Sequence, residues 1–366
     1  MTINIDLLDL PDEIAAEVER LTATYEFEKL SEKGENGYLF IARNSVIDRR
    51  VAIKFYFWAD GTREHVEPKT LAAVKSDSVV KVLDASLVGD EWAMFITPFC
   101  SNGDLDRFRE SHRFGLRDGL TFVSQLLEGV AALHQSGFVH RDLKPENLLV
   151  SDSHGPLIAD FGSVRRIPDG QKDVSGSGHA VLYRPPESFL TARYDRRGDL
   201  YQCGIVLYQV SGGRLPYAYQ EYLSESELAT YAHMQDAFDR SKLVESAIRK
   251  RANDGTLLDL KTLPFFTPSS VKALIGRATS VDPADRFQTA SDFMNKLNSV
   301  WSKAADWRYE DKTPVAFGNG VRFRVTLVGS KYVAEQDRGS GWRRIPKAGE
   351  GTLSQQVRLI EKRCLE

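Results

Sequence analysis

The eight residues from His140 to Asn147, His-Arg-Asp-Leu-Lys-Pro-Glu-Asn, constrain what this chain can fold into more than any other feature. They place an acid at Asp142, a lysine two positions later at Lys144 and an amide at Asn147. These groups suit transfer of a phosphoryl group to a hydroxyl. The acid can orient the hydroxyl and accept its proton, the lysine can offset charge, and the amide oxygen can bind magnesium. Such a run rarely arises by chance, so we expect it to be the centre of a catalytic site.

This segment resembles the catalytic loop of the protein kinase family, and of its serine/threonine branch in particular, because a lysine follows the acid by two positions. Two distant motifs extend the resemblance. Asp160 begins an Asp-Phe-Gly tripeptide 18 residues after Asp142, and Lys54 ends the sequence Val-Ala-Ile-Lys. The resemblance implies that Asp160 links magnesium to the phosphates of ATP and that Lys54 binds the α and β phosphates.

The loop that covers the phosphates departs from the family pattern. Gly34 and Gly37 match its second and third glycines, whereas Glu32 occupies the position of the first. Backbone amides approach a polyphosphate closely only where side chains are absent, so we expect Glu32 to weaken or reshape the clamp. The resemblance still implies that Gly34, Gly37 and Leu39 contact the nucleotide.

The resemblance also implies a helix carboxylate that pairs with Lys54. Alignment of the run from Ser78 to Asp84 selects Glu67, with Glu64 as the runner-up. Pro68 follows Glu67 directly and disfavours the helical conformation of the residue before it. We therefore expect the helix either to begin there or to be kinked, and the ion pair to form in only one state of the protein.

Further nucleotide contacts follow from the same resemblance. They are Thr97 at the back of the adenine pocket, the backbone of Pro98 through Cys100 as the hinge, Ala52 and Leu149 on the two faces of the base, and Asp104 at the ribose. For the thiol of Cys100 we favour an inert, half-buried side chain over a redox role.

Three matches are expected to be structural. The segment Tyr183–Glu187 resembles the motif that closes the activation segment, with Pro185 in place of the usual alanine. Arg286 is the expected ion-pair partner of Glu187. Asp199 resembles the helix aspartate that braces the catalytic loop.

The activation segment carries a second departure. Ala180 stands where serine/threonine kinases usually have a threonine hydroxyl, so we expect slower transfer or a different acceptor geometry. A phosphate at Ser175 or Ser177 is predicted to order the segment through Arg141, with help from Arg165 or Arg166. An unmodified, flexible loop remains the alternative.

Periodicity predicts a strand-rich lobe followed by a helical lobe, and the resemblance implies that together they form an α+β fold of the bilobal protein-kinase type. Strand-like apolar runs lie between residues 25 and 97, among them Arg50–Lys54, Val79–Leu83 and Trp92–Ile96, and helical spacing follows Gly103. The length of 366 residues suggests two to three units. We divide the chain into a helical extension (1–24), a kinase domain (25–300, with N-lobe 25–97, hinge 98–103 and C-lobe 104–300) and a C-terminal unit (301–366).

The C-terminal unit is more basic than the rest, with 13 Lys and Arg against 8 Asp and Glu. Alternating apolar residues after Val321 and a capping pair at Thr352 and Gln355 predict a strand meander followed by one helix. The arginines at 322, 324, 343 and 344 invite a nucleic-acid interpretation. We favour solvated strand faces instead, with Phe323 and Trp342 in the core of the unit.

Composition narrows the partners and the compartment. The formal net charge is −3, which makes nucleic acid an improbable partner, and no apolar run is long enough to span a membrane. Three scattered cysteines and an acidic N-terminus predict a protein of the cytoplasm. A metal site at His65 with Glu64 and Glu67 is disfavoured because other ligands are missing. The oligomeric state stays open.

Together these features predict an ATP- and Mg²⁺-dependent serine/threonine protein kinase that phosphorylates proteins and also itself. The alternative is a catalytically silent kinase fold that acts as a binding scaffold, an idea motivated by Glu32, Pro68 and Ala180. A kinase of small molecules is disfavoured by the segments Lys144–Glu146 and Tyr183–Glu187, which belong to enzymes that dock polypeptides.

Overall fold

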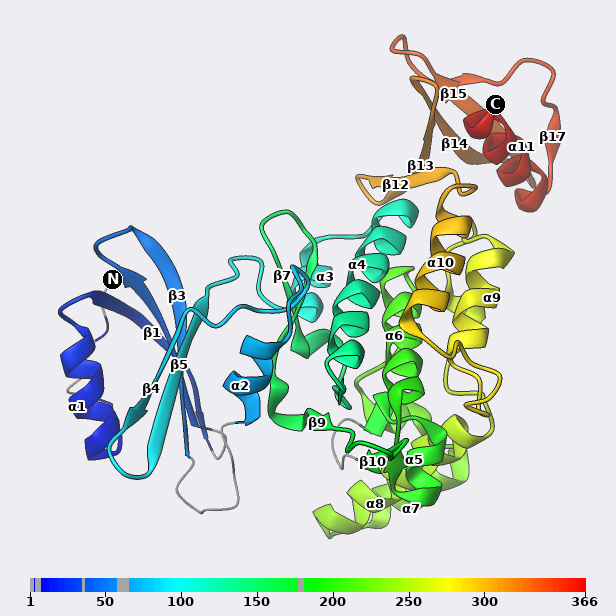
Figure 1. Cartoon of the computed structure of the whole chain (residues 1–366). Helices are drawn as coiled ribbons and strands as arrows, with labels where there is room; N and C mark the ends of the chain where they lie inside the picture. The colour runs from blue at the N-terminus through cyan, green and yellow to red at the C-terminus, as the bar shows by residue number, and fades with distance from the viewer. Residues whose placement is uncertain (1–2, 4–7, 35–36, 58–65, 177–180) are drawn as a thin grey trace.

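The computed structural model describes residue 3 and residues 8–34, 37–57, 66–176 and 181–366. Figure 1 shows a strand-rich lobe on one side, a larger helical lobe beside it, and a third unit of strands and one helix beyond the helical lobe. The predicted α+β bilobal fold with a C-terminal strand and helix extension is therefore confirmed.

The N-lobe is built on an antiparallel sheet, which within the described residues has the strand order β1-β2-β3-β5-β4. Burial alternates along β3, where Val51, Ile53 and Phe55 are buried and their neighbours are partly exposed. That alternation is expected for a sheet with one covered face. The strands are β1 (Tyr25–Gly34), β2 (Gly37–Asn44), β3 (Arg49–Phe57), β4 (Asp84–Val88) and β5 (Trp92–Pro98).

Helix α1 (Asp12–Leu21) covers this sheet. Its residues Ile14, Val18 and Leu21 recur at helical spacing, are buried, and belong to the same apolar cluster as Phe40 and Ile53 of the sheet. The apolar periodicity of this helix therefore anchors it to the N-lobe.

Helix α2 (Val66–Ala73) begins one residue before Glu67, so Pro68 lies in its first turn. Proline is tolerated there because the first backbone N–H groups of a helix have no partner inside it. The described part of α2 starts at Val66 and continues past Pro68 to Ala73. The runner-up Glu64 and the neighbouring His65 lie outside the described residues.

The strand expected at Val79–Leu83 is wrong, and the true edge strand, β4, starts at Asp84. Val79 instead bridges to Ile158 of the larger lobe, and Val80 N donates to Ile158 O at 3.0 Å. Both valines are buried in the core of that lobe. Their apolar character thus reflects the connection between the lobes and not the N-lobe sheet.

The C-lobe is assembled around α4 (Leu116–Gln135) and α6 (Arg196–Val210). In α6 every residue from Gly198 to Val210 is buried, which explains its unbroken apolar run. By contrast α7 (Glu225–His233) has no buried residue, as its charge-rich sequence predicts. The other helices are α3 (Leu105–Ser111), α5 (Pro186–Thr191), α8 (Ala237–Asn253), α9 (Ser269–Ala278) and α10 (Ala290–Trp301).

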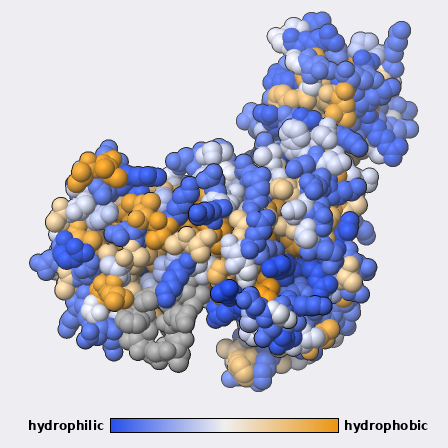
Figure 2. All heavy atoms as spheres, in the orientation of Figure 1, coloured by the Kyte–Doolittle hydropathy of each residue, from blue (hydrophilic) through white to orange (hydrophobic). Residues whose placement is uncertain are grey.

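Short strands and 3-10 turns lie between the helices of this lobe. The strands are β6 (Phe138–Val139), β7 (Leu148–Val150), β8 (Pro156–Ile158), β9 (Arg165–Arg166), β10 (Val174–Ser175) and β11 (Arg193–Tyr194). The 3-10 turns are η2 (Pro145–Asn147), η3 (Phe161–Ser163), η4 (Val181–Tyr183), η5 (Tyr219–Tyr222) and η6 (Leu260–Thr262). Figure 2 shows that hydrophilic residues cover most of the visible face of this lobe, while hydrophobic residues gather over parts of the N-lobe.

The C-terminal unit is an antiparallel sheet with helix α11 (Leu353–Leu365) packed on it. Thr352 and Gln355 form the predicted capping box at the start of this helix. The strands are β12 (Asp306–Glu310), β13 (Thr313–Gly318), β14 (Val321–Val328), β15 (Lys331–Asp337), β16 (Arg343–Arg344) and β17 (Glu350–Gly351).

The core of this unit continues into the C-lobe. Trp307 of β12 is fully buried and stacks on Phe266 with ring centroids 5.1 Å apart. Phe323 is buried as expected, but the placement of Trp342 in the core is wrong. Trp342 is half-buried beside Arg322 and Arg324, because alternate residues of β14 point to opposite faces and the arginines face away from Phe323.

Candidate active site

The catalytic loop holds Asp142 through its own neighbours. Asn147 Nδ2 donates to Asp142 Oδ2 at 2.9 Å and to the Asp142 carbonyl at 2.8 Å, and Lys144 Nζ lies 3.2 Å from Oδ2. The other carboxylate oxygen, Oδ1, is buried and has no hydrogen-bond partner in the described part of the chain. A buried acceptor without a donor is costly, so this oxygen is suited to receive a hydroxyl from a bound molecule.

Asp199 of α6 fastens the backbone of this loop. Its fully buried carboxylate accepts hydrogen bonds from His140 N at 2.9 Å, Arg141 N at 2.9 Å, Tyr194 OH at 2.9 Å and His134 Nε2 at 2.8 Å. Burial alone would raise the pKa of Asp199, but the bond and the charge from His134 outweigh it and hold this pKa below the ordinary value. The predicted bracing position of Asp199 is observed.

Gln202 lies one turn further along α6 and was missed by the sequence reasoning. It accepts from Leu143 N at 2.9 Å and donates to the Arg141 carbonyl at 3.2 Å. Arg141 has a φ of 70°, a left-handed conformation that needs such support in a residue with a side chain. The i, i+3 spacing of Asp199 and Gln202, which puts both on one helix face, was the available signal.

In the N-lobe, Lys54 of β3 pairs with Glu67 of α2. Lys54 Nζ lies 2.9 Å and 3.2 Å from the two carboxylate oxygens of Glu67. Glu67 Oε1 also accepts from Phe161 N at 3.3 Å, which joins this pair to the Asp-Phe-Gly segment. The expected partner of Lys54 is therefore found, and the early start of α2 does not prevent the contact.

Asp160 is held in an unusual backbone conformation, with a φ of 54°. Its Oδ1 accepts from Gly162 N at 3.4 Å. The next residue, Phe161, is fully buried and meets the ring of His140 edge to face at 5.3 Å. His140 Nε2 in turn lies 3.2 Å from the Ala159 carbonyl, so the catalytic loop and the Asp160 segment support each other.

The residues expected around the nucleoside lie on both sides of the hinge. Ala52 is paired with Thr97 between β3 and β5, and Pro98 ends β5 next to this pair. On the C-lobe side, Leu149 of β7 forms an isolated bridge with Asp104. The side chain of Asp104 also caps α3, because it accepts a hydrogen bond from the backbone N of Arg107. This cap is a local structural reason for an aspartate at this position, in addition to the ribose contact that the resemblance implies.

Cys100 lies in the expected hinge, two residues after Pro98. Burial, together with the charge of Asp152, raises the pKa of its thiol to about 11. A thiol with such a pKa is protonated near neutral pH and a poor nucleophile, which agrees with the inert role expected for it.

The glycines of the phosphate loop end one strand and begin the next. Gly34 and Gly37 are paired at the tip of β1 and β2, and Leu39 lies opposite Lys54 in β3. Gly37 has a φ of 111°, and a Cβ there would stand 1.9 Å from the Phe55 carbonyl. The hairpin itself therefore requires this glycine. The side chain of Glu32 lies outside the described part of the structure.

Arg141 joins two parts of the activation segment by donating to their backbone carbonyls. Its Nε donates to the Ser163 carbonyl at 2.7 Å, and its Nη1 donates to the Ser175 carbonyl in β10. Burial and the nearby charge of Arg165 lower the pKa of the Arg141 guanidinium. Phosphorylation of Ser175 or Ser177 stays a prediction, and Ser177 and Ala180 lie outside the described residues.

The end of the activation segment is anchored by the expected ion pair. Arg286 is fully buried and contacts the carboxylate of Glu187 with both terminal nitrogens, at 2.6 and 2.9 Å. Pro185 precedes α5 and Pro186 is its first residue, which fixes the direction in which the segment enters the helix.

The arginines of the C-terminal unit are largely neutralised by neighbouring acids. Arg322 pairs with Glu310 and Asp337, and Arg324 pairs with Glu335. Arg344 lies 3.4 Å from Glu350. These pairs offset the charge of three of the four arginines that invited a nucleic-acid interpretation.

The described residues contain no group of three or more His, Cys, Asp or Glu side chains placed to hold a metal ion. None of the helices in the described ranges is both long and apolar enough to cross a membrane.

Residues 25–301 match the family model described as the protein kinase domain. The chain belongs to the protein kinase family. Within that family its relatives place it in the serine/threonine branch of the eukaryotic type. Members of this family use ATP as the phosphoryl donor.

Bacterial relatives support the assignment to the serine/threonine branch. The serine/threonine-protein kinase pkn2 of Myxococcus xanthus is 34% identical over 198 residues, 50% of this chain and 24% of that protein. Pkn3 of the same organism is 28% identical over 297 residues, 75% of this chain and 50% of pkn3. PrkC of Bacillus subtilis is 24% identical over 293 residues, 77% of this chain and 41% of PrkC. The chain thus spans between a quarter and a half of the length of these relatives.

Proposed function

We propose that this chain is an ATP- and Mg²⁺-dependent serine/threonine protein kinase that phosphorylates hydroxyls of other proteins and of itself. The observation that carries the proposal is the arrangement at Asp142. Asn147 and Lys144 hold one of its oxygens, while the other is buried with no donor in the described residues. This is the arrangement that a base for a hydroxyl acceptor requires.

In the proposed reaction, Asp142 Oδ1 accepts a hydrogen bond from the acceptor hydroxyl and orients it toward the γ phosphorus. The new oxygen–phosphorus bond forms as the bond to the β-phosphate oxygen breaks. ADP leaves with that electron pair, and the hydroxyl proton passes to Asp142. Lys144, beside Asp142, offsets negative charge on the transferred group.

Lys54 and the residues near the hinge position the donor. Glu67 holds the ammonium of Lys54, which then binds the α and β phosphates. The backbone of the glycine hairpin covers the phosphates. The nucleoside contacts proposed here are those of Gly34, Gly37, Leu39, Ala52, Pro98, Cys100, Asp104 and Leu149.

The side chains of Asp160 and Asn147 fit a magnesium ion. Both offer oxygen, the ligand that this ion prefers. Both Nδ2 contacts of Asn147 go to Asp142, so its amide oxygen is the atom left for a ligand. Bound magnesium would neutralise phosphate charge as it develops.

The scaffold alternative loses one of its three motives. It rested on Glu32, Pro68 and Ala180, and the Lys54–Glu67 pair forms despite Pro68. No comparison favours the scaffold, since the relatives are named as kinases.

The flanking segments and the location are part of the same proposal. We assign residues 1–24 to an N-terminal extension and residues 301–366 to an accessory unit beside a kinase domain of residues 25–300. Cys100, Cys203 and Cys364 are free thiols, which supports a reducing compartment such as the cytoplasm.

The test is transfer from labelled ATP with magnesium to a generic acceptor protein, followed by mass spectrometry of the kinase itself. Asp142→Asn should lower the rate by about a hundredfold or more and leave nucleotide binding unchanged. Asp152→Asn is the matched control, because Asp152 is exposed and contacts Ser101. Absence of incorporation by folded wild-type protein would overturn the proposal and favour the scaffold.

A further inference from the structure

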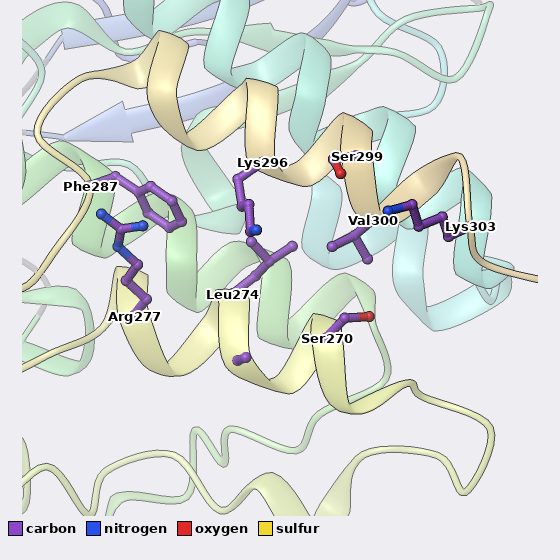
Figure 3. Close-up of a pocket in the computed structure, with 9 residues that line it drawn as sticks. Ser270, Leu274, Arg277, Phe287, Lys296, Ser299, Val300 and Lys303 are labelled. Atoms are coloured by element: carbon purple, nitrogen blue, oxygen red, sulfur yellow. The ribbon is translucent and has the colours of Figure 1, made fainter.

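A basic groove lies between α9 and α10, on the side of the C-lobe that faces away from the N-lobe (Figure 1). It encloses about 400 Å³. The two helices run in opposite directions along it, and their side chains converge on the space between them (Figure 3). None of the residues assigned above to the catalytic site lines it.

The two helices present the same spacing to the groove. Each contributes residues at positions i, i+3, i+4 and i+7, which is one face of a helix over two turns. They are Ser270, Ala273, Leu274 and Arg277 on α9, and Lys296, Ser299, Val300 and Lys303 on and just after α10. Such a pair of parallel ridges forms a trough that a third helix can fill.

The charge of the groove has one sign. Arg277, Lys296 and Lys303 are exposed, and no carboxylate is among the lining residues. In the described part of the chain these three cations make no ion pair. The guanidinium of Arg277 lies over the ring of Phe287 at 4.3 Å, which fixes its position at one end of the groove.

The floor and the rim of the groove differ in character. Leu274, Val300 and Phe287 are buried and form an apolar floor. Ser270, Ala273 and Ser299 are small and exposed at the rim, so the backbone of a docked segment can approach closely. An occupant of small and apolar residues flanked by carboxylates would complement both features.

We propose that the α9–α10 groove docks an acidic amphipathic helix of a partner protein. Two helical turns rise by about 10 Å, the length over which the eight positions are spread. Acidic side chains at i, i+4 and i+7 of the partner would meet the three cations in turn. This binding step does not depend on the proposed catalytic function.

The effect of docking on the reaction rests on the proposed function, and it acts through the effective concentration of the substrate. A substrate tethered at the groove leaves the catalytic residues untouched, while its acceptor hydroxyl gains effective concentration. Loss of the groove should therefore raise KM for such a substrate and leave kcat unchanged.

The first experiment uses fluorescence anisotropy to measure binding of a labelled helical peptide to the protein. One face of the peptide has Ala and Leu residues, and Glu residues lie on both sides of that face. A peptide of the same composition in scrambled order is the reference. The double variant Lys296→Glu with Lys303→Glu should weaken peptide binding by about tenfold or more. Raising the salt concentration from 0.1 M to 1 M should also weaken it, because the Debye length falls from about 10 Å to about 3 Å.

A second variant tests the shape of the groove without altering its charge. Ala273→Tyr fills the rim and should weaken binding, whereas Ala229→Tyr, at an exposed alanine of α7, should not. The charge control is Lys250→Glu with Lys331→Glu, both exposed and outside the groove. Equal binding of the ordered and scrambled peptides, or full binding by the Lys296 and Lys303 variant, would overturn the proposal.

A second copy of this chain is the competing occupant, because α7 is acidic and exposes Leu228. Light scattering distinguishes the two. A mass that stays monomeric as concentration rises supports a separate partner. Self-association that disappears in the Lys296 and Lys303 variant would show the groove to be an interface between copies, and would overturn the assignment.

Discussion

The catalytic loop and the Lys54–Glu67 pair serve the same proposed reaction, but the protein holds them in different ways. The loop is fastened by Asp199 and Gln202, whose side chains are buried in α6 and bonded to several successive backbone groups. In the N-lobe, Lys54 and Glu67 form a partly exposed ion pair, with side chains 23% and 14% exposed, and Glu67 also accepts from Phe161 N.

This difference indicates where the site can move. Buried polar groups are costly to leave unsatisfied, so the catalytic loop keeps one conformation. A partly exposed ion pair contributes little to stability, so α2 can shift at small cost. We therefore expect the C-lobe part of the site to be permanently assembled and the N-lobe part to be the adjustable one.

The largest expected effect comes from Asp199→Asn. The N–H groups of the new amide would face groups that now donate hydrogen bonds to the carboxylate of Asp199, so some of these donors would lose their acceptor. The free energy of unfolding should therefore fall by about 3 to 5 kcal/mol. Urea denaturation measures this. Asp195→Asn on the same helix is the control, since asparagine caps a helix as well as aspartate does. Equal stability of the two variants would refute the idea of a permanently fastened loop.

The next effect concerns the N-lobe. Glu67→Gln should leave stability within about 1 kcal/mol of wild type, yet lower kcat/KM by about a hundredfold, because Lys54 loses its fixed position. Glu17→Gln removes a similar exposed pair with Arg20 and should change neither quantity. If Glu67→Gln proves as destabilising as Asp199→Asn, the two regions are not held differently.

Acid should weaken the fastening of the loop. The pKa of Asp199 is lower in the folded than in the unfolded chain, so its stabilisation is complete above the ordinary value of 3.8 and is lost as the pH falls through the folded value. The stability gap between wild type and Asp199→Asn should therefore be largest near pH 7 and shrink below pH 3.8. A gap that is constant with pH would contradict this assignment.

The smallest effect is a difference in thiol labelling. Cys203 is fully buried in α6 beside Gln202, while Cys100 lies at the hinge with 9% of its surface exposed. With a thiol pKa of about 11, Cys100 should react slowly with iodoacetamide at pH 8 in the folded protein. In mild urea it should be labelled before Cys203, because the hinge opens at lower cost than α6. Mass spectrometry of the labelled peptides shows which cysteine is labelled first. Labelling of Cys203 before Cys100 would contradict the expected difference between the hinge and α6.

The motifs could be recognised in the sequence because each combines unusual residue types at a spacing that does not depend on packing. The positions of Lys54, Asp142, Asn147 and Asp160, and the pair of Glu187 with Arg286, followed from them. The strand at Val79–Leu83 was misplaced because a run of valines is equally compatible with an edge strand and with a connection buried between two lobes.

The prediction that Trp342 lies in the core of the C-terminal unit was wrong for a related reason. An aromatic residue next to a short strand can face a core or stack on arginines of the opposite face, and only the register of the sheet separates the two arrangements.

By itself the sequence determined the family, the lobes and the residues proposed to carry the chemistry, since these follow from local patterns and fixed offsets. The tertiary structure alone decided that Gln202, His134 and Tyr194 fasten the catalytic loop, and that α9 and α10 align their cations along one groove. The physical reason is that such contacts join residues distant in the chain, and their geometry exists only once the helices have packed.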